Sequence, residues 1–206
     1  MYQGIIFDLD GTLWDSTLQI LPAWNTALRR HEKQIRLTHE RLKSLMGKTA
    51  AEIAGQLLPE YPPEESFSII KECCKEELIY LKKSGGTLYP RLNEVLQTLS
   101  CQNELYIVSN CQEGYIDAFL DFHDLRRYFT DYQWEGNPGR SKGENIKEVM
   151  IRNQLASAIY VGDTQGDLDA ADFAAIPFIY AAYGFGQVNR AVPKIESPAE
   201  LLPLCD

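Results

Sequence analysis

Two aspartates, Asp8 and Asp10, directly follow a short apolar run in the segment GIIFDLDGTLWDS, residues 4–16. On an extended strand, side chains two positions apart point to the same side, so both carboxylates would face one spot while Leu9 faces the core. Like charges that crowd together raise each other's pKa. The pair therefore indicates either a cation bound between the carboxylates or a proton held by one of them for acid–base chemistry.

Polar side chains also follow two later apolar runs, ELYIVSN (104–110) and SAIYVGD (157–163), and a lysine precedes the helical stretch that leads into the second of them. Carboxylates are hard oxygen ligands that suit Mg²⁺, which keeps coordination positions for substrate phosphate. Hydroxyls, an amide and an ammonium suit a phosphoryl group. The candidate residues are Asp8, Asp10, Thr12, Ser109, Asn110, Lys142, Asp163 and Asp167.

The elements that must position these residues read as an α/β pattern. Strand-like apolar runs lie at 4–9, 104–110, 157–163 and 177–184, and they alternate with helical patterns at 113–126, 143–153 and 167–175. Continuous apolar strands between helices are typical of a doubly wound parallel sheet that is covered on both faces. Ligands of such sheets bind beyond the carboxyl ends of the strands, so the candidate residues are expected to meet there.

The stretch from about residue 15 to 87 contains no convincing strand. Helical spacing relates Leu18, Leu21, Trp24 and Leu28, and again Ile70, Cys74, Leu78 and Leu81, with loops expected at 58–66 and 82–90. We therefore expect a helical cap domain, residues 15–87, inserted into an α/β core domain of residues 1–14 and 88–206. Ser84, Gly85 and Gly86 form the candidate hinge.

Composition narrows the range of partners. The 206 residues carry 20 basic and 29 acidic side chains, a formal net charge of −9, which disfavours nucleic acid and anionic membranes as partners. The five cysteines are odd in number and match no zinc pattern, so reduced thiols are expected. No signal peptide or membrane span is visible, and a cytoplasmic protein, monomeric or homodimeric, is the expectation.

Four segments of the sequence together resemble the motifs of the haloacid dehalogenase-like hydrolase superfamily. DLDGT (8–12) resembles its first motif, VSN (108–110) its second, Lys142 in GRSKGEN its third and GDTQGD (162–167) its fourth. They occur in the family order across nearly the whole chain. The family's common Lys-Pro pair is here Lys142-Gly143, and Arg140 is the nearest alternative cation. The helical insert is similar to the first type of cap, as in phosphoglycolate-phosphatase-like members.

The resemblance implies a Mg²⁺-dependent phosphatase that acts on a small phosphomonoester. Asp8 is then the nucleophile that becomes an aspartyl-phosphate, and Asp10 is the general acid and base. It also implies that Mg²⁺ is bound by the Asp8 carboxylate, the Asp10 backbone carbonyl and Asp163, with Asp167 acting through water or orienting the other ligands. Phosphate oxygens are held by Thr12, Ser109 and Asn110, and Lys142 balances charge.

Alternatives remain for function and for individual residues. A phosphomutase of the β-phosphoglucomutase type, a dehalogenase and a catalytically silent regulatory module are the rival functions, and the substrate itself is open. Lys48 in the cap segment SLMGKTAAEI (44–53) could reach the non-reacting end of an anionic substrate or could simply be solvated. We expect the three tryptophans to be packing residues, and surface positions for His31, His39 and His123.

Overall fold

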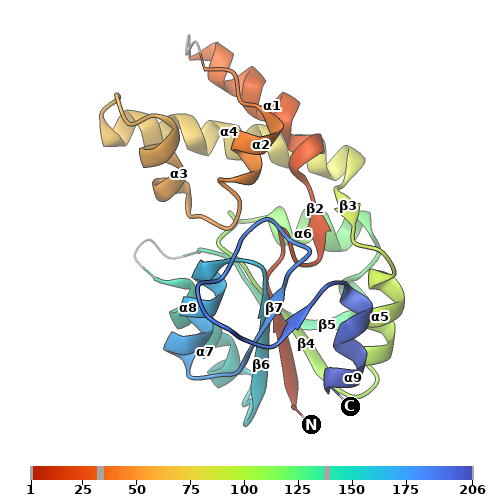
Figure 1. Cartoon of the computed structure of the whole chain (residues 1–206). Coiled ribbons are helices and arrows are strands. Elements are labelled where there is room, and N and C mark those ends of the chain that lie inside the picture. The colour runs from red at the N-terminus through yellow and green to blue at the C-terminus, as the bar shows by residue number, and fades with distance from the viewer. Residues whose placement is uncertain (1, 32–34, 137–139, 206) are drawn as a thin grey trace.

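A six-stranded parallel sheet forms the core in the computed structural model, which describes residues 2–31, 35–136 and 140–205 (Figure 1). The strand order is β5-β4-β1-β6-β7-β8. The N-terminal strand is central, because Gly4 pairs with Glu104 of β4 on one side and with Ala158 of β6 on the other. The strands are β1 (Gly4–Phe7), β4 (Glu104–Val108), β5 (Phe129–Gln133), β6 (Ala158–Gly162), β7 (Phe178–Ala181) and β8 (Lys194–Ile195).

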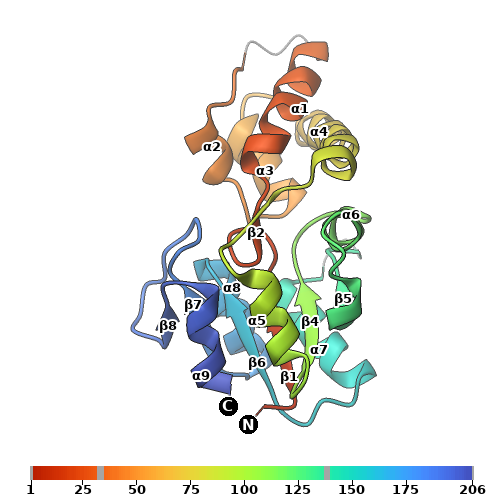
Figure 2. The ribbon, with the colours of Figure 1, turned by 90° about the vertical axis from the view of Figure 1, so that its right-hand side faces the viewer.

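Helices cover both faces of this sheet, as the continuous apolar runs predict (Figure 2). Alternate residues of β1 serve opposite faces: Ile6 packs with α7 and α8, whereas Ile5 and Phe7 pack with α5 and α6. The fold is therefore the doubly wound α/β sheet expected from the sequence. The core helices are α5 (Leu92–Leu99), α6 (Tyr115–Phe122), η1 (Arg126–Tyr128), α7 (Lys142–Arg152), α8 (Gln165–Ala174), η2 (Pro198–Leu201) and α9 (Leu202–Cys205).

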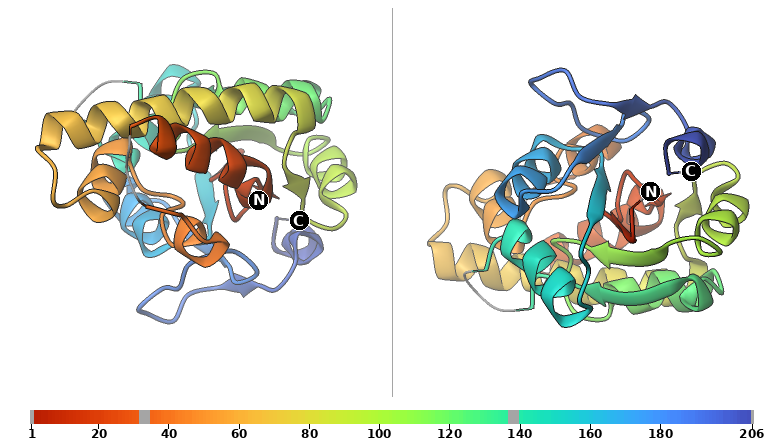
Figure 3. Two further views of the ribbon diagram at one scale, coloured as in Figure 1. Left: turned by 90° about the horizontal axis from the view of Figure 1, so that it is seen from above. Right: turned by 90° about the horizontal axis from the view of Figure 1, so that it is seen from below.

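Four further helices lie over the carboxyl ends of the strands, with α1 running alongside α4 (Figures 1 and 3). They connect to the core through a short antiparallel ribbon of β2 (Trp14–Asp15) and β3 (Thr87–Leu88). Asp15 and Thr87, the ends of the cap predicted from the sequence, are paired with each other in this ribbon. The cap helices are α1 (Thr17–Arg30), α2 (His39–Lys43), α3 (Ala50–Leu57) and α4 (Pro63–Ser84).

Several boundaries differ from the sequence-based expectations. The segment 15–87, in which no strand is expected, has a short strand at each end. Two-residue strands have no periodicity in the sequence that would predict them. The expected loops 58–66 and 82–90 are too long: α4 already begins at Pro63, where proline suits the first helical position, and it continues to Ser84. Strands β5 and β8 were not expected either; β5 has the sequence FTDYQ, and β8 spans only two residues.

The aromatic and sulfur-containing side chains mostly occupy the expected environments. Trp14 and Trp24 are fully buried packing residues. The four cysteines whose side chains are described, Cys73, Cys74, Cys101 and Cys111, are free thiols. Within the described chain, no helix is long and apolar enough to cross a membrane.

The three histidines, for which surface positions are expected, are each half-buried rather than fully exposed. His123 packs edge-on against Trp14 and Phe122, His39 contacts the Thr17 hydroxyl, and His31 pairs with Glu72. A polar helical stretch predicts exposure only on average. The contacts of a ring at the end of a helix depend on the neighbouring elements.

Candidate active site

The Asp8 carboxylate lies at the carboxyl edge of the central strand. The Asp8 backbone N–H donates to the Val161 carbonyl at 2.8 Å, so sheet pairing continues one residue past β1 and fixes the residue beside β6. The side chain is fully buried, and one of its oxygens accepts a hydrogen bond from the Lys142 ammonium at 2.8 Å. The sheet thus places a buried carboxylate where ligands of this fold class bind.

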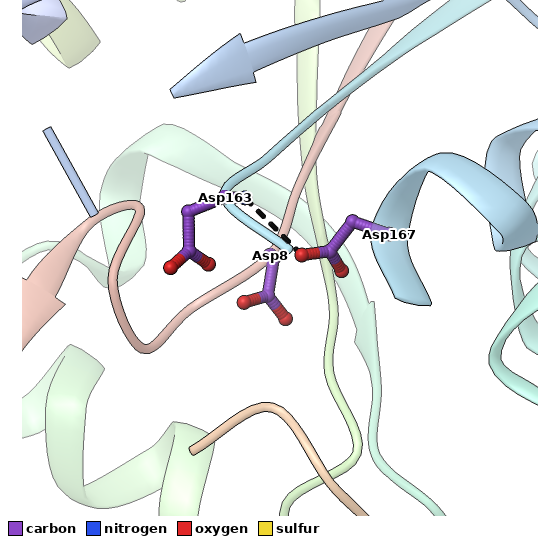
Figure 4. A group of neighbouring side chains, drawn as sticks. All are labelled: Asp8, Asp163 and Asp167. Atoms are coloured by element: carbon purple, nitrogen blue, oxygen red, sulfur yellow. Dashed lines mark hydrogen bonds between the residues drawn. The ribbon is translucent and has the colours of Figure 1, made fainter. Parts of the chain in front are cut away.

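Asp8, Asp163 and Asp167 form a buried trio of carboxylates (Figure 4). One oxygen of each lies within 4.8 Å of the others. Asp8 Oδ2 and Asp163 Oδ1 are buried and have no hydrogen-bond partner among the residues that the structure describes. Two orphaned carboxylate oxygens on neighbouring strand ends fit a hard divalent cation, because buried carboxylate oxygens otherwise require donors.

The pKa values of the trio reflect this crowding. Burial, together with the charge of Asp167, raises the pKa of Asp8 to about 7, although Lys142 opposes the shift. Burial, together with the charges of Asp167 and Asp8, also raises the pKa of Asp163. A cation between the two side chains would relieve the repulsion and favour their charged forms.

Asp167 differs from the other two acids because both of its carboxylate oxygens accept hydrogen bonds. Its Oδ2 accepts hydrogen bonds from the backbone N–H groups of Asp163 and Thr164 and from the Thr164 hydroxyl, at 2.7–3.1 Å. Its Oδ1 accepts from the Lys142 ammonium at 2.7 Å. Both oxygens are therefore engaged, Oδ2 with the loop that carries Asp163 and Oδ1 with Lys142. This arrangement supports the orienting role for Asp167 rather than direct ligation.

Lys142 is the buried cation of the site. It is the first residue of α7, where the helix dipole disfavours positive charge, and it nevertheless contacts both Asp8 and Asp167. Burial alone would lower its pKa, but the two carboxylates raise it well above the usual value, so the ammonium is charged. The alternative cation, Arg140, is exposed and pairs with Glu148.

Gly143, which stands where the family commonly has proline, lies in close contact with α8. A Cβ at Gly143 would lie 2.6 Å from the ring of Phe173, because α7 and α8 approach closely there. A side chain at position 143 would therefore clash with α8, while Lys142 beside it contacts Asp8 and Asp167.

Asp10 points to a separate environment on the cap side of the site. Its Oδ1 accepts hydrogen bonds from the Ser16 hydroxyl at 2.8 Å and the Tyr115 hydroxyl at 2.9 Å. Burial raises the pKa of Asp10 to about 6, against the effect of these two donors. The carboxylate is not part of the trio. Asp8 and Asp10 therefore both lie at the strand end, but they do not face one spot as expected. Asp8 contacts Lys142, whereas Asp10 contacts Ser16 and Tyr115.

The candidate phosphate-binding residues lie around the trio. Thr12 is buried, and its hydroxyl has no partner within the described part of the chain. Ser109 is buried at the end of β4, where its N–H donates to the Gln133 carbonyl. The Asn110 side chain instead donates to the Gly47 carbonyl of the cap at 3.0 Å, so here it joins the two parts of the chain.

Two glycines allow the loops to close on Asp163. Gly11 has φ +85°, and a Cβ there would lie 2.2 Å from an Asp163 carboxylate oxygen. A Cβ at Gly184 would lie 2.3 Å from the Asp163 Cβ. Any side chain at these positions would displace the carboxylate, so the glycine of DLDGT is needed for the site and not only for a turn.

A small cavity of about 50 Å³ lies between the cap and the core. Asp10 and Ser109 line it on the core side. Lys48 lines it from the cap, and its ammonium donates to the Ser44 carbonyl at 2.7 Å. A wider groove of about 400 Å³ adjoins Lys48 on its other side.

Sequence reasoning did not identify four residues that shape this region: Ser16 and Tyr115, which hold Asp10, and Glu77 and Gln112, which meet across the cap–core boundary at 2.6 Å. Tyr115 is 105 positions from Asp10. No local pattern connects such pairs. The one available signal was Glu77 itself, an acid among the helical positions of the cap near Cys74, Leu78 and Leu81.

Two phosphatases are similar to this chain over nearly its whole length. The chain is 26% identical to the phosphoglycolate phosphatase of Aquifex aeolicus (strain VF5), covering 98% of this chain and 96% of that protein. It is 23% identical to the phosphoglycolate phosphatase of Escherichia coli (strain K12), with coverage of 98% and 91%.

Solved structures share the fold over the whole chain. A haloacid dehalogenase-like family hydrolase from Streptococcus pneumoniae superimposes with a TM-score of 0.84 at 22% identity, covering 100% of this chain and 99% of that one. CbbY from Rhodobacter sphaeroides, in complex with phosphate, gives 0.82 at 17%, with coverage of 98% and 96%. The family model described as haloacid dehalogenase-like hydrolase matches residues 5–181, and the chain belongs to that family.

Proposed function

We propose that this chain is a Mg²⁺-dependent phosphatase that hydrolyses a small phosphomonoester through an aspartyl-phosphate on Asp8. The observation that carries the proposal is the pair of buried, unpartnered oxygens, Asp8 Oδ2 and Asp163 Oδ1, beside a buried ammonium. The phosphatase names of the relatives that match nearly the full chain support it.

Asp8, Asp163 and the Asp10 backbone carbonyl would hold Mg²⁺, with Asp167 orienting the loop. When bound, the metal would neutralise the charge of Asp8 and of the phosphoryl group. Lys142 contributes a second positive charge from the opposite side of Asp8, since its ammonium contacts the Oδ1 atom. Thr12 and Ser109 supply hydroxyl groups for phosphate oxygens at the ends of their loops.

The reaction has two displacements at phosphorus. In the first, an Asp8 oxygen forms a bond to phosphorus while the bond to the leaving alkoxide breaks, and Asp10 gives its proton to that oxygen. In the second, water attacks phosphorus, its proton passes to Asp10, and the Asp8–phosphorus bond breaks to release inorganic phosphate. A carboxyl with a pKa of about 6 suits both transfers near neutral pH.

Two variants test these roles with nitrophenyl phosphate. Asp8→Asn should release no nitrophenolate, because an amide is a poor nucleophile. Asp10→Asn should still be phosphorylated, because nitrophenolate leaves without a proton, but its second step should slow by ~10²–10⁴-fold. Stopped-flow absorbance should then show a burst of about one nitrophenolate per active site, followed by slow turnover.

A burst from Asp8→Asn, or a wild-type steady rate from Asp10→Asn, would contradict the assignment. A measurement of free phosphate in the same reaction separates the rival functions. A phosphomutase would release little free phosphate, and a silent regulatory module would release none.

A further inference from the structure

The segment that follows β7, residues 183–186, reaches the candidate site. β7 pairs in parallel with β6, so the chain leaves it beside Asp163. The backbone N–H groups of Phe185 and Gly186 donate to Asp163 Oδ2 at 2.7 and 3.3 Å. These two bonds satisfy Oδ2, whereas Oδ1 has no partner among the residues that the structure describes.

The side chain of Tyr183 makes a second contact with the site. Its hydroxyl donates to the Thr12 backbone carbonyl at 2.8 Å, across 171 positions of the sequence. On the other side of the same residue, the Thr12 N–H donates to the Leu9 carbonyl at 3.2 Å. The peptide groups before and after Thr12 are therefore both held, and together they set the direction in which the Thr12 side chain leaves the backbone.

The ring of Tyr183 is itself held in place by a second tyrosine. It packs edge-on against the ring of Tyr89, with centroids 4.6 Å apart and ring planes at 63°. Tyr89 directly follows β3, and its N–H donates to the Leu13 carbonyl at 3.3 Å. The two tyrosines thus bind consecutive carbonyls of the loop, and the ring contact restricts the position of the Tyr183 hydroxyl.

The Thr12 hydroxyl is the group that this arrangement directs. It is buried and has no partner within the described part of the chain, so a hydrogen bond to a ligand oxygen would satisfy it. Such a hydroxyl binds an anion best when its direction is fixed beforehand, because a movable group must first be ordered.

We propose that Tyr183 is a positioning residue for phosphate binding: its hydroxyl, through the Thr12 carbonyl, directs the Thr12 side chain toward a phosphate oxygen. This inference rests on the proposed phosphatase function. Tyr183 acts through Thr12 and is not itself a catalytic residue. A tyrosine with a merely structural part would stabilise the fold without changing the affinity for phosphate.

Tyr183→Phe tests the proposal, because it removes the hydroxyl and keeps the ring beside Tyr89. With saturating Mg²⁺, the dissociation constant for inorganic phosphate, measured by calorimetry, should rise by about threefold to tenfold, the value of one net hydrogen bond. The kcat/KM for nitrophenyl phosphate should fall by a similar factor. Mg²⁺ binding without phosphate should change by less than about twofold, because backbone N–H groups hold Asp163.

Tyr180→Phe is the matched control. It breaks a hydrogen bond of the same kind to the same segment, from the Tyr180 hydroxyl to the Gly186 carbonyl at 2.7 Å, and leaves the bond to the Thr12 carbonyl in place. With saturating Mg²⁺, its affinity for inorganic phosphate should stay within about twofold of the wild type.

A double-mutant cycle with Thr12→Val tests the path of the effect. Valine has a shape similar to that of threonine and lacks the hydroxyl. If Tyr183 acts through that hydroxyl, Tyr183→Phe should change the phosphate affinity of the Thr12→Val protein by less than about twofold.

The outcomes separate the inference from the proposed function. Unchanged phosphate affinity in Tyr183→Phe, an equal loss in Tyr180→Phe, or the full loss in the Thr12→Val background overturns the inference and leaves the phosphatase function standing. A wild-type protein that neither binds inorganic phosphate nor releases it from any ester overturns the proposed function itself.

Discussion

The buried carboxyl of Glu77 gives the fold a measurable dependence on pH. Burial raises its pKa from the ordinary 4.5 to about 8, although the hydrogen bonds from Trp24 and Gln112 oppose the shift. Between these two values the native protein holds one proton that the unfolded chain has lost. The stabilisation is therefore complete below about pH 4.5 and is lost as the pH rises through 8.

The magnitude follows from the linkage relation. One proton difference changes the free energy of unfolding by ~1.4 kcal/mol per pH unit, so the contribution of Glu77 falls by ~3 kcal/mol between pH 5 and pH 8. Glu77→Gln removes the titration. The amide would meet the Gln112 amide N–H with a donor instead of an acceptor, which adds a pH-independent loss of ~1 kcal/mol.

The stabilities of the two proteins should therefore cross. Glu77→Gln should be less stable than the wild type at pH 5 by ~1 kcal/mol and more stable at pH 8 by ~2 kcal/mol. Urea unfolding followed by tryptophan fluorescence at four pH values measures this difference, and Trp24 beside Glu77 reports on the cap. Taking the difference between variants cancels the titration of Asp8 and Asp10, which the two proteins share.

The exposed Glu64 in the first turn of the same helix provides the control. Glu64→Gln removes the same charge from α4, and its stability difference from the wild type should stay nearly level over this range. The contrary outcome is a stability of Glu77→Gln, relative to the wild type, that stays constant or falls as the pH rises. Either result would show that the Glu77 carboxyl is charged in the native protein and would refute the reasoning.

Two predictions concern the site itself. Activity should require Mg²⁺ and disappear with chelator, and Ca²⁺ should inhibit, because its looser and larger coordination misplaces Asp8; equal turnover in excess EDTA would remove the metal assignment. Lys48→Ala should raise KM for an ester with a second anionic group more than for nitrophenyl phosphate, with kcat nearly unchanged, because Lys48 lines the cavity without touching the acid trio. Small, equal effects on both esters in steady-state kinetics would assign Lys48 to the solvated surface.

The sequence was most informative where chemistry and local pattern coincide. The strands that end in Asp8, Ser109 and Asp163 are continuous apolar runs, so their type and the meeting of their carboxyl ends could be predicted. The place of Lys142 before a helical stretch made it a candidate, but nothing in GRSKGEN indicates that its ammonium becomes buried between two carboxylates.

Other features could not be predicted for physical reasons. The ribbon of β2 and β3 is too short to have a period, and its pairing joins residues far apart in the chain. The hydrogen bonds of Ser16 and Tyr115 to Asp10 depend on how the cap junction and α6 meet. The Asn110 side chain was expected at phosphate, but its contact with Gly47 depends on the approach of the cap, which no local pattern encodes.

The central position of β1 has a consequence for how the chain acquires its structure during synthesis. Its partners in the sheet, beginning at Glu104 and Ala158, are made about 100 and 154 residues later. At ~5–20 residues per second, the first strand waits ~8–30 s for its second neighbour to leave the ribosome. Meanwhile α1 to α4 can pack on each other, since their contacts are complete by residue 84. The apolar first strand, and Asp8 at its end, thus depend on the last third of the chain, because truncation there would leave the strand without its β6 partner.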